Sequence, residues 1–339
     1  MDENNSQNYL VSSSPHIRAD EDTRSIMIDV VVALLPALVI ACYFFGLRAL
    51  TLTVLSVTCC VIFELLYQYF LKKPVRVGDF SAVVTGVLLA FNLPASTPYF
   101  MVVVGAFFAI VIVKQLFGGI GKNFMNPALA ARVFLFSWAD RINVWPQPMA
   151  DPALGAMDPM PVDFVTTATP LASLKNGRLP DVSFFDMALG NIGGSLGEIS
   201  AFMLAMGGLY LLFRGVINIR IPLSFIGTVA ILTFVFSKNA DAFSFMTYHV
   251  LSGGLLLGAF FMATDYSTSP TTRWGQIIYG VGCGLLTVFI RYFGSYPEGV
   301  SFAILIMNAC TWLIESYTRP RRYGVTRKKL FAAKGGEAK

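Results

Sequence analysis

Long apolar runs recur along this chain and constrain its fold more than any other feature of the sequence. Runs of about 18 to 22 residues match the ~30 Å hydrocarbon core of a bilayer at a helical rise of about 1.5 Å per residue. Of the 339 residues, 55% are hydrophobic and only 13% are charged, whereas soluble domains are about one quarter charged. The sequence therefore predicts an all-α polytopic membrane protein.

Ten such runs are separated by charged or turn-forming residues, and each is expected to form one membrane span. The fifth opens with Asn126-Pro127 and the tenth follows Tyr296-Pro297. Because proline has no N–H to donate, both are predicted break points in the helices. The predicted spans lie at 27–46, 49–71, 80–97, 99–117, 124–139, 192–213, 220–237, 244–263, 274–292 and 299–316.

The second half of the chain aligns with the first at a nearly constant offset. The aligned pairs are Asp29 with Glu198, Thr85 with Ser252 and Pro127 with Pro297, which lie 169, 167 and 170 positions apart. A five-span unit crosses the membrane an odd number of times, so two copies in one chain have opposite orientations. The sequence predicts ten transmembrane helices arranged as two inverted five-helix repeats that meet near the midplane.

The distribution of lysine and arginine predicts the orientation of these spans. The carboxyl-terminal stretch "RPRRYGVTRKKLFAAKGGEAK" is the strongest basic cluster and is expected in the cytoplasm, which with ten spans places the amino terminus there too. The segment 140–190, with six Asp against three Lys or Arg, then falls on the outer face. The expected regions are a cytoplasmic segment 1–26, the first repeat 27–139, an outer-face loop 140–191, the second repeat 192–316 and a basic cytoplasmic tail 317–339.

Ionisable groups within a membrane are energetically unfavourable and are therefore candidates for function. Glu64 lies inside the second predicted span, and Asp265 and Glu298 adjoin predicted breaks, so these three are candidates for an ion path or gate. The alternative for Glu64 is a bond to a neighbouring helix. Charged residues near predicted span ends are expected to extend toward the interface, namely Lys114, Arg132 and Glu315.

Several kinds of site are not expected in this chain. Its five cysteines form no C-x-x-C pair and its two histidines are far apart, so we predict no metal site. Neither "FGGIG" nor "GGSLG" fits the dinucleotide-binding fingerprint. The net charge of +5 mostly reflects the basic tail and does not indicate nucleic acid.

The outer-face loop contains the hydroxyl-rich stretch "PVDFVTTATPLASLKNGRLPD". It is either a solvated connection or a segment in which one hydroxyl carries a group. From the residues alone, a solute or ion transporter and a membrane component of a redox complex both remain open. A purely structural anchor is the weakest interpretation, because it requires neither ten spans nor broken helices.

Five stretches in order, from about residue 11 to residue 320, resemble the RnfD and NqrB family of membrane subunits. They are "SSSPHIRADEDTRSIMIDVVVALLPA", "VTGVLLAFNLP", "KQLFGGIGKNFMNPALAARVFLF", "FFMATDYSTSPTTRWGQIIYG" and "GSYPEGVSFAILIMNA". The short amino-terminal segment and its "SPHIR" favour the Rnf side of the family.

The resemblance implies a covalent flavin in the outer loop. In this family a threonine of an A-T motif bears FMN through a phosphoester bond, and the matching residue in "TTATPL" is Thr169. Thr166 and Thr167 stand where the motif often has Ser-Gly and are expected to be loop or recognition residues. The resemblance also implies noncovalent riboflavin at the repeat interface.

The function implied by the resemblance is that of a flavin-bearing subunit in ferredoxin:NAD⁺ oxidoreduction coupled to Na⁺ or H⁺ translocation. The chain would work in a prokaryotic cytoplasmic membrane as part of an oxidoreductase, without being catalytically complete alone. Its expected partners are the other Rnf subunits, including a second covalent-flavin subunit and Fe–S subunits, together with a flavin transferase and membrane lipid. Alternatives are an NqrB-like subunit of a Na⁺-translocating NADH:quinone reductase, or a transporter or channel of this fold without a redox role.

Overall fold

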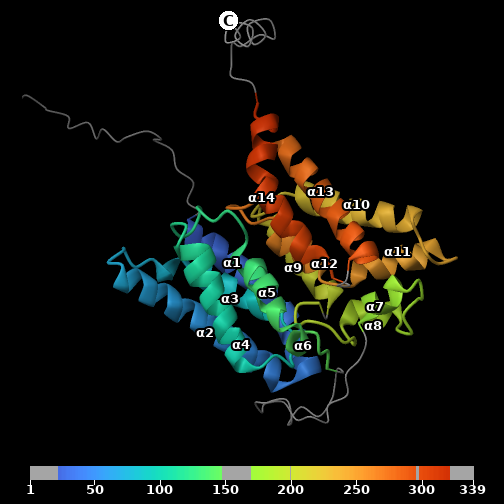
Figure 1. The fold of residues 1–339 in the computed structure, drawn as a ribbon, viewed down its shortest axis with the longest axis horizontal. Coiled ribbons are helices and arrows are strands. Elements are labelled where there is room, and N and C mark those ends of the chain that lie inside the picture. The colour runs from blue at the N-terminus through green and yellow to red at the C-terminus, as the bar shows by residue number, and fades with distance from the viewer. Residues whose placement is uncertain (1–21, 147–168, 199, 295–297, 321–339) are drawn as a thin grey trace, which may run out of the picture.

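A computed structural model describes residues 22–146, 169–198, 200–294 and 298–320, and every regular element in these ranges is a helix. The predicted all-α class is therefore confirmed for the described residues. The terminal regions, most of the outer loop with Thr166 and Thr167, and the predicted break at Pro297 lie outside them. Figure 1 shows the elements of the amino-terminal half gathered beside those of the carboxyl-terminal half.

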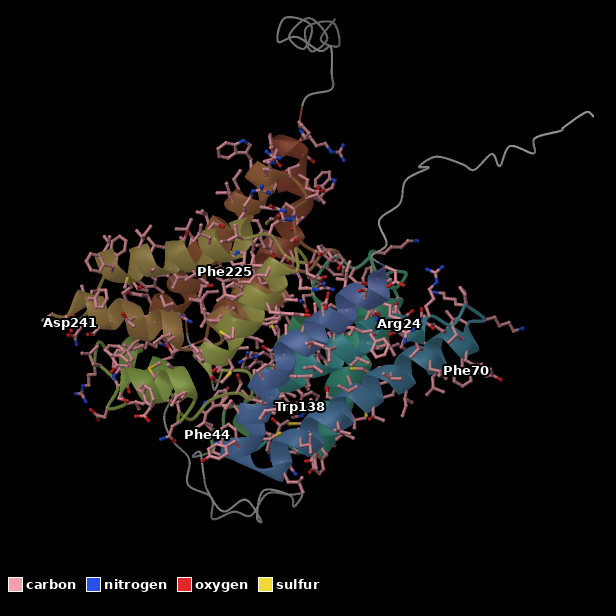
Figure 2. All side chains as sticks on the ribbon, turned by 180° about the vertical axis from the view of Figure 1, so that it is seen from behind. Arg24, Phe44, Phe70, Trp138, Phe225 and Asp241 are labelled. Atoms are coloured by element: carbon pink, nitrogen blue, oxygen red, sulfur yellow. The ribbon has the colours of Figure 1, made fainter. Side chains whose placement is uncertain are left out.

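The first half is built from α1 (Thr23–Phe45), α2 (Leu47–Phe70), α3 (Ser81–Phe91), α4 (Tyr99–Phe107) and α5 (Pro127–Leu135). Short elements flank them: the 3₁₀ turns η1 (Val77–Asp79) and η3 (Phe136–Trp138), the π-helix η2 (Phe108–Gln115), and α6 (Ala139–Ile142). In Figure 2, Arg24 and Phe44 mark the two ends of α1, and Phe70 at the end of α2 lies toward the Arg24 end, as expected for antiparallel neighbours.

Two short helices, α7 (Pro170–Lys175) and α8 (Phe184–Leu189), lead into the second half. It contains α9 (Ala201–Phe213), α10 (Arg220–Val235), α11 (Ala242–Leu251), α12 (Leu255–Leu257), the π-helix η5 (Gly258–Met262), α13 (Arg273–Phe293) and α14 (Val300–Thr318). Most of these elements share one buried apolar core with those of the first half, while Phe245 and Tyr248 of α11 belong to a second, smaller cluster.

Among the described helices, α1, α2, α13 and α14 are long and apolar enough to cross a membrane. A fifth span results if α11 and the segment Leu255–Met262, which meet at an angle of 59°, count as one broken helix. The other predicted spans coincide with shorter apolar helices: Ser81–Phe91, Tyr99–Gln115, Pro127–Trp138, Ala201–Phe213 and Arg220–Val235. Length thus supports four or five spans, and the ten-span arrangement stays a prediction.

Several helices are shorter than the spans predicted for them. The span predicted at 80–97 is helical only to Phe91, and the one predicted at 192–213 begins only at Ala201. The span predicted at 124–139 starts at Pro127, where the Asn126 side chain accepts hydrogen bonds from the first free amides of α5. Apolar composition therefore located these helices but also included apolar, non-helical backbone next to them.

Buried arginines satisfy the backbone where helices end inside the protein. Arg48 donates to the carbonyl oxygens of Ala95 and Thr97 beyond α3, at 3.2 and 2.9 Å. Arg291 donates to the carbonyl oxygens of His249 and Ser252 where α11 ends, at 2.6 and 3.0 Å. Unpaired carbonyls in an apolar medium are strongly unfavourable, so these guanidinium groups allow the helices to break.

Helix packing follows a corresponding pattern in the two halves. In the first half α2 contacts α3 and α4, and α4 contacts α5; in the second half α10 contacts α11 and α13, and α13 contacts α14. Between the halves, α1 packs on α9 and α5 packs on α14. These are the helices that the sequence repeat aligns with each other.

Substituting Gly207 tests the packing between α1 and α9. A Cβ atom there would lie 2.2 Å from the Ala33 carbonyl oxygen, so α1 would have to shift. We expect Gly207→Ala to lower the free energy of unfolding by about 1–3 kcal/mol, as overpacking does. Gly227→Ala is the control, because its Cβ would meet nothing within 4 Å and alanine favours a helix by about 1 kcal/mol. Thermal unfolding of the detergent-solubilised protein measures both; equal melting temperatures would contradict the packing.

Candidate functional site

Thr169 lies immediately before α7, in an extended conformation with φ −66° and ψ 148°. Pro170 opens the helix, which suits proline because the first helical N–H needs no partner. The Thr169 carbonyl accepts a hydrogen bond from the Ala172 amide at 2.9 Å. The side chain is only 7% exposed, so an enzyme that modifies this hydroxyl requires α7 to be displaced or not yet packed.

The helix after Thr169 is packed against one end of the second half. Leu171 and Leu174 are buried in a small apolar cluster with Met187, Phe245 and Tyr248. Lys175 donates to the Gly294 carbonyl oxygen at 2.7 Å, and the Tyr248 hydroxyl donates to that of Val182 at 2.7 Å. Thr169 is therefore anchored near the ends of α11 and α13 and is not on a detached loop.

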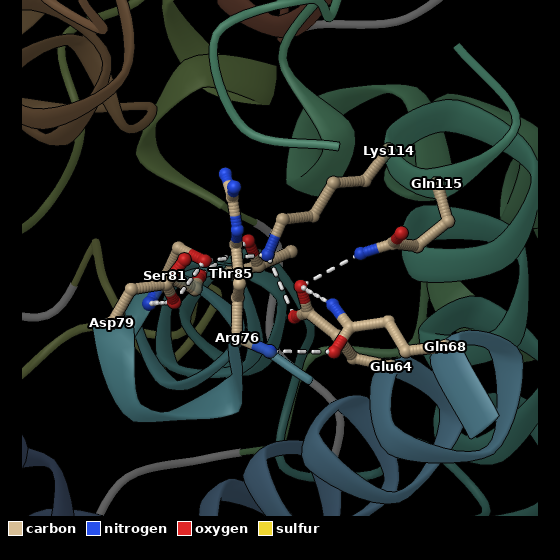
Figure 3. A network of polar contacts seen from close by, with 8 residues as sticks. All are labelled: Glu64, Gln68, Arg76, Asp79, Ser81, Thr85, Lys114 and Gln115. Carbon is tan, nitrogen blue, oxygen red and sulfur yellow. Dashed lines mark hydrogen bonds and ion pairs between the residues drawn. The ribbon is translucent and has the colours of Figure 1, made fainter. Parts of the chain in front are cut away.

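Glu64 is buried in α2 and accepts hydrogen bonds from two consecutive residues of the π-helix η2. Lys114 Nζ lies 2.7 Å from Glu64 Oε2, and Gln115 Nε2 lies 2.7 Å from Glu64 Oε1. The Lys114 and Glu64 side chains are each 2% exposed. The expectation that Lys114 extends to the interface is wrong, because η2 presents it to this carboxylate, as Figure 3 shows.

The network around Glu64 extends to the start of α3. Lys114 Nζ also donates to the Ser81 hydroxyl at 2.6 Å, and that hydroxyl donates to Asp79 at 2.6 Å. A cavity of about 380 Å³ adjoins the network. Its walls include Glu64, Gln115, the positive-φ glycines Gly118 and Gly119, and the side chains of Lys73, Arg76, Asp79 and Lys122. Glu64 thus bonds a neighbouring helix and also lines a polar cavity, and its part in an ion path stays a prediction.

Asp265 follows η5 and is held by the hydroxyls of Ser267 and Thr268, at 2.9 and 3.3 Å. It lines a cavity of about 90 Å³ between the two halves, whose walls come from α1, α3, α5, α9 and η5. A second cavity of about 220 Å³ lies next to it. The two share Ile217, Thr264 and Tyr266 as lining residues.

Glu298, just before α14, forms an ion pair across the halves with Arg132 of α5. The same guanidinium nitrogen lies 3.9 Å from Glu198 Oε1, in the segment before α9. Arg132 Nη1 also donates to Asn92 Oδ1 at 2.9 Å. Arg132 is 4% exposed, so the expectation that it extends to the interface is wrong.

The three candidates for an ion path or gate are not brought into one site. Glu64 belongs to the network of the first half, Asp265 to the cavities near η5, and Glu298 to the cluster around Arg132. Sequence reasoning missed Glu198 as a partner of Glu298. The signal was present, because the repeat aligned Glu198 with the acidic Asp29, but alignment alone did not reveal its partner.

Long apolar helices, broken helices and buried ion pairs define a polytopic helical membrane protein. The chain belongs to the NQR2, RnfD, RnfE family, whose model matches residues 10–324. This confirms the resemblance and its coverage of nearly the whole chain.

Curated relatives of this chain are components of ion-translocating complexes. One, the D subunit of the Na⁺-translocating ferredoxin:NAD⁺ oxidoreductase complex of Acetobacterium woodii, is 51% identical over 328 residues, 96% of this chain and 98% of the relative. The D subunit of the proton-translocating ferredoxin:NAD⁺ oxidoreductase complex of Clostridium ljungdahlii is 42% identical, over 94% of this chain and 97% of the relative. The D subunit of the ion-translocating oxidoreductase complex of Halorhodospira halophila is 37% identical, over 93% and 95%.

Proposed function

We propose that this chain is the D subunit of an ion-translocating ferredoxin:NAD⁺ oxidoreductase complex. The observation that carries the proposal is the match over nearly the full length of both chains to relatives with that name, at up to 51% identity. The transported ion is Na⁺ or H⁺, because the relatives' names include both. Its partners are the other subunits of the complex, including a second covalent-flavin subunit and Fe–S subunits.

The test is a deletion of this chain in its own host. Inverted membrane vesicles from the deletion strain should lose ion uptake driven by reduced ferredoxin and NAD⁺, and the gene restored in trans should recover it. Retention of coupled uptake without the chain would contradict the assignment. Ion uptake that depends on this chain and is driven by NADH with a quinone as the electron acceptor would instead indicate the NqrB-like alternative.

We propose ten spans in two inverted repeats, with both termini in the cytoplasm of a prokaryotic cell. The corresponding helix contacts in the two halves support this arrangement, as does the meeting of α1 with α9 and α5 with α14. The Lys175–Gly294 bond supports the orientation, because it joins two segments that are predicted to lie on the same outer face. Cysteine labelling from either side of the membrane at Lys175 and Lys122 tests it.

We propose that Thr169 carries FMN as a phosphoester. The Thr169 hydroxyl would attack the flavin-side phosphate of FAD, the anhydride bond would break with AMP leaving, and the hydroxyl proton would pass to solvent. A flavin transferase with Mg²⁺ would catalyse this step. A flavin bound there supplies one- and two-electron chemistry, and α7 fixes the attachment point against the ends of α11 and α13.

We propose that noncovalent riboflavin binds between the halves near Asp265. The walls there are mostly apolar, and Asn126, Thr85 and Asp265 supply polar groups. Small-molecule sites usually enclose about 300–1,000 Å³, so cavities of 90 and 220 Å³ hold a three-ring flavin only if Tyr266 moves. The amount of flavin that acid releases from the purified complex should therefore be lower in the Asn126→Leu variant, while the flavin attached at Thr169 should remain.

Glu64→Gln should lower the number of ions moved per electron severalfold. The substitution removes the charge that holds Lys114 in a buried network next to a polar cavity. Ion uptake into inverted vesicles per NADH formed measures the ratio. Glu315→Gln is the control, because Glu315 is also a carboxylate on a helix but accepts its hydrogen bonds from the backbone and hydroxyl of Thr271. An unchanged ratio in Glu64→Gln would remove Glu64 from the ion path.

A further inference from the structure

Buried polar atoms without hydrogen-bond partners are concentrated in one place. Among the described residues eight such side-chain atoms occur, and five of them belong to residues that neighbour one another: Arg132, Glu198, His249, Arg291 and Glu298. The other three belong to Asn123, Ser195 and Thr287. Native proteins leave few buried polar groups unsatisfied, so the concentration of five in one place requires a physical explanation.

Contacts join these five residues into one polar cluster, to which the first half contributes Arg132 and the second half the other four. Arg132 contacts both Glu198 and Glu298, and Arg291 Nη1 lies 3.4 Å from His249 Nδ1. The two parts meet at the break after α11. A Cβ atom on Gly254 would lie 3.1 Å from Glu198 Oε1, and one on Gly253 would lie 2.9 Å from Arg291 Nη2.

Glu198 and Glu298 are the acidic residues of this cluster. They are 6% and 8% exposed, and they share one guanidinium nitrogen of Arg132. Both carboxyl groups approach the same Arg132 Nη2 atom, yet Oε1 of each lacks a hydrogen-bond partner. Two adjacent buried carboxylates repel each other when both are charged. A proton held between them removes that repulsion and supplies the missing hydrogen bond.

The geometry of this cluster favours a bound proton over a bound metal ion. Sodium or calcium requires several oxygen ligands around one point, and the described residues contain no group of three or more Asp, Glu, His or Cys side chains placed to hold a metal. The Arg132 guanidinium already occupies the position between the carboxylates where a cation would be attracted. Arg291 places a second positive charge nearby, with its donors directed at carbonyl oxygens.

We propose that Glu198 and Glu298 form a proton-binding site, with one proton shared between them. The charged and titratable groups that face it are Arg132 from α5, Arg291 from α13 and His249 from α11. The site also lies near the Thr169 segment, because Leu171 of α7 packs at the position where a Cβ on Gly253 would be. A role of this site in coupling rests on the proposed function, whereas the presence of a proton on it does not.

Infrared spectroscopy of the intact, detergent-solubilised complex tests the proposal. A protonated carboxylic acid has a carbonyl stretch that is separate from the bands of carboxylates and amides and shifts in D₂O. We expect this band in the wild type at neutral pH, lost in both Glu198→Gln and Glu298→Gln. It should remain in the matched control Glu315→Gln.

Labelling makes the test independent of whether the variants assemble. Glutamate labelled with carbon-13 at the side-chain carboxyl shifts a glutamic acid band but leaves a band from buried Asp265 in place. A wild-type spectrum without any glutamic acid band would overturn the proposal, as would a band that survives in both glutamine variants. Because the readout needs neither flavin nor turnover, a loss of the Thr169 assignment would not affect it.

Discussion

Replacing Thr169 with alanine is expected to abolish covalent flavin on this chain completely. The substitution removes the hydroxyl that the proposed phosphoester requires, while α7 keeps Pro170 at its start and the buried anchors Leu171 and Leu174. The measurement is in-gel flavin fluorescence of the denatured protein, made in its host or together with a flavin transferase. Thr169→Ser should keep a band, since serine offers a hydroxyl at the same position.

Two neighbouring threonines provide matched controls for this loss. Thr166→Ala and Thr167→Ala change the same short motif but leave the expected acceptor in place, so both should remain fluorescent. If the fluorescent band disappears in one of these controls and persists in Thr169→Ala, the flavin is attached at the control threonine and not at Thr169. A dark wild type, with the transferase active on another substrate, would remove the flavin from this loop and favour the transporter alternative.

Arg132→Met should be the most destabilising single substitution in the interface between the halves. It removes the positive charge that neutralises Glu198 and Glu298 and the donor to Asn92, all in buried surroundings. Breaking a buried ion pair by removing one partner costs about 3–5 kcal/mol. Thermal unfolding of the solubilised protein measures the loss.

Arg214→Met is the matched control. Arg214 also pairs with an acidic residue across the halves, at 3.1 Å from Asp29, but its side chain is 51% exposed. Exposed pairs contribute about 0–1 kcal/mol, so this variant should unfold close to the wild type. Adding Glu298→Gln to Arg132→Met should restore part of the stability, because it removes one unpaired charge. Equal melting temperatures for Arg132→Met and Arg214→Met would show that the Arg132 cluster is open to water.

Apolar runs predicted where helices lie, because burial in lipid or in protein requires the same residue types. They could not predict where the helices end. The span predicted at 80–97 includes the turn "NLPAST" beyond Phe91, where Pro94 has no N–H to continue the helix and Arg48, distant in the sequence, satisfies the Ala95 and Thr97 carbonyls. At α9 the first apolar residues form a loop whose Leu196 and Gly197 amides donate to carbonyls beside α3.

The burial of individual charged residues was even harder to predict from the sequence than the ends of the helices. Lys114 and Arg132 stand near the ends of apolar runs, and nothing local distinguishes them from residues that extend to an interface. Their burial depends on partners 50 and 166 residues away, Glu64 and Glu298. Thr169 could be predicted from a motif, since the motif consists of one residue and its sequence neighbours, whereas the Arg132 cluster exists only once the two halves are packed together.

The glycine break after α11 has a mechanical consequence. Gly253 and Gly254 have φ values of 71° and 63°, which would make a flexible joint if the carbonyls around it were free. The Arg291 guanidinium of α13 holds the Ser252 and Gly253 carbonyls, and Leu171 of α7 lies against Gly253. The break is therefore tied to both α13 and α7, and bending the chain there would require these contacts to separate.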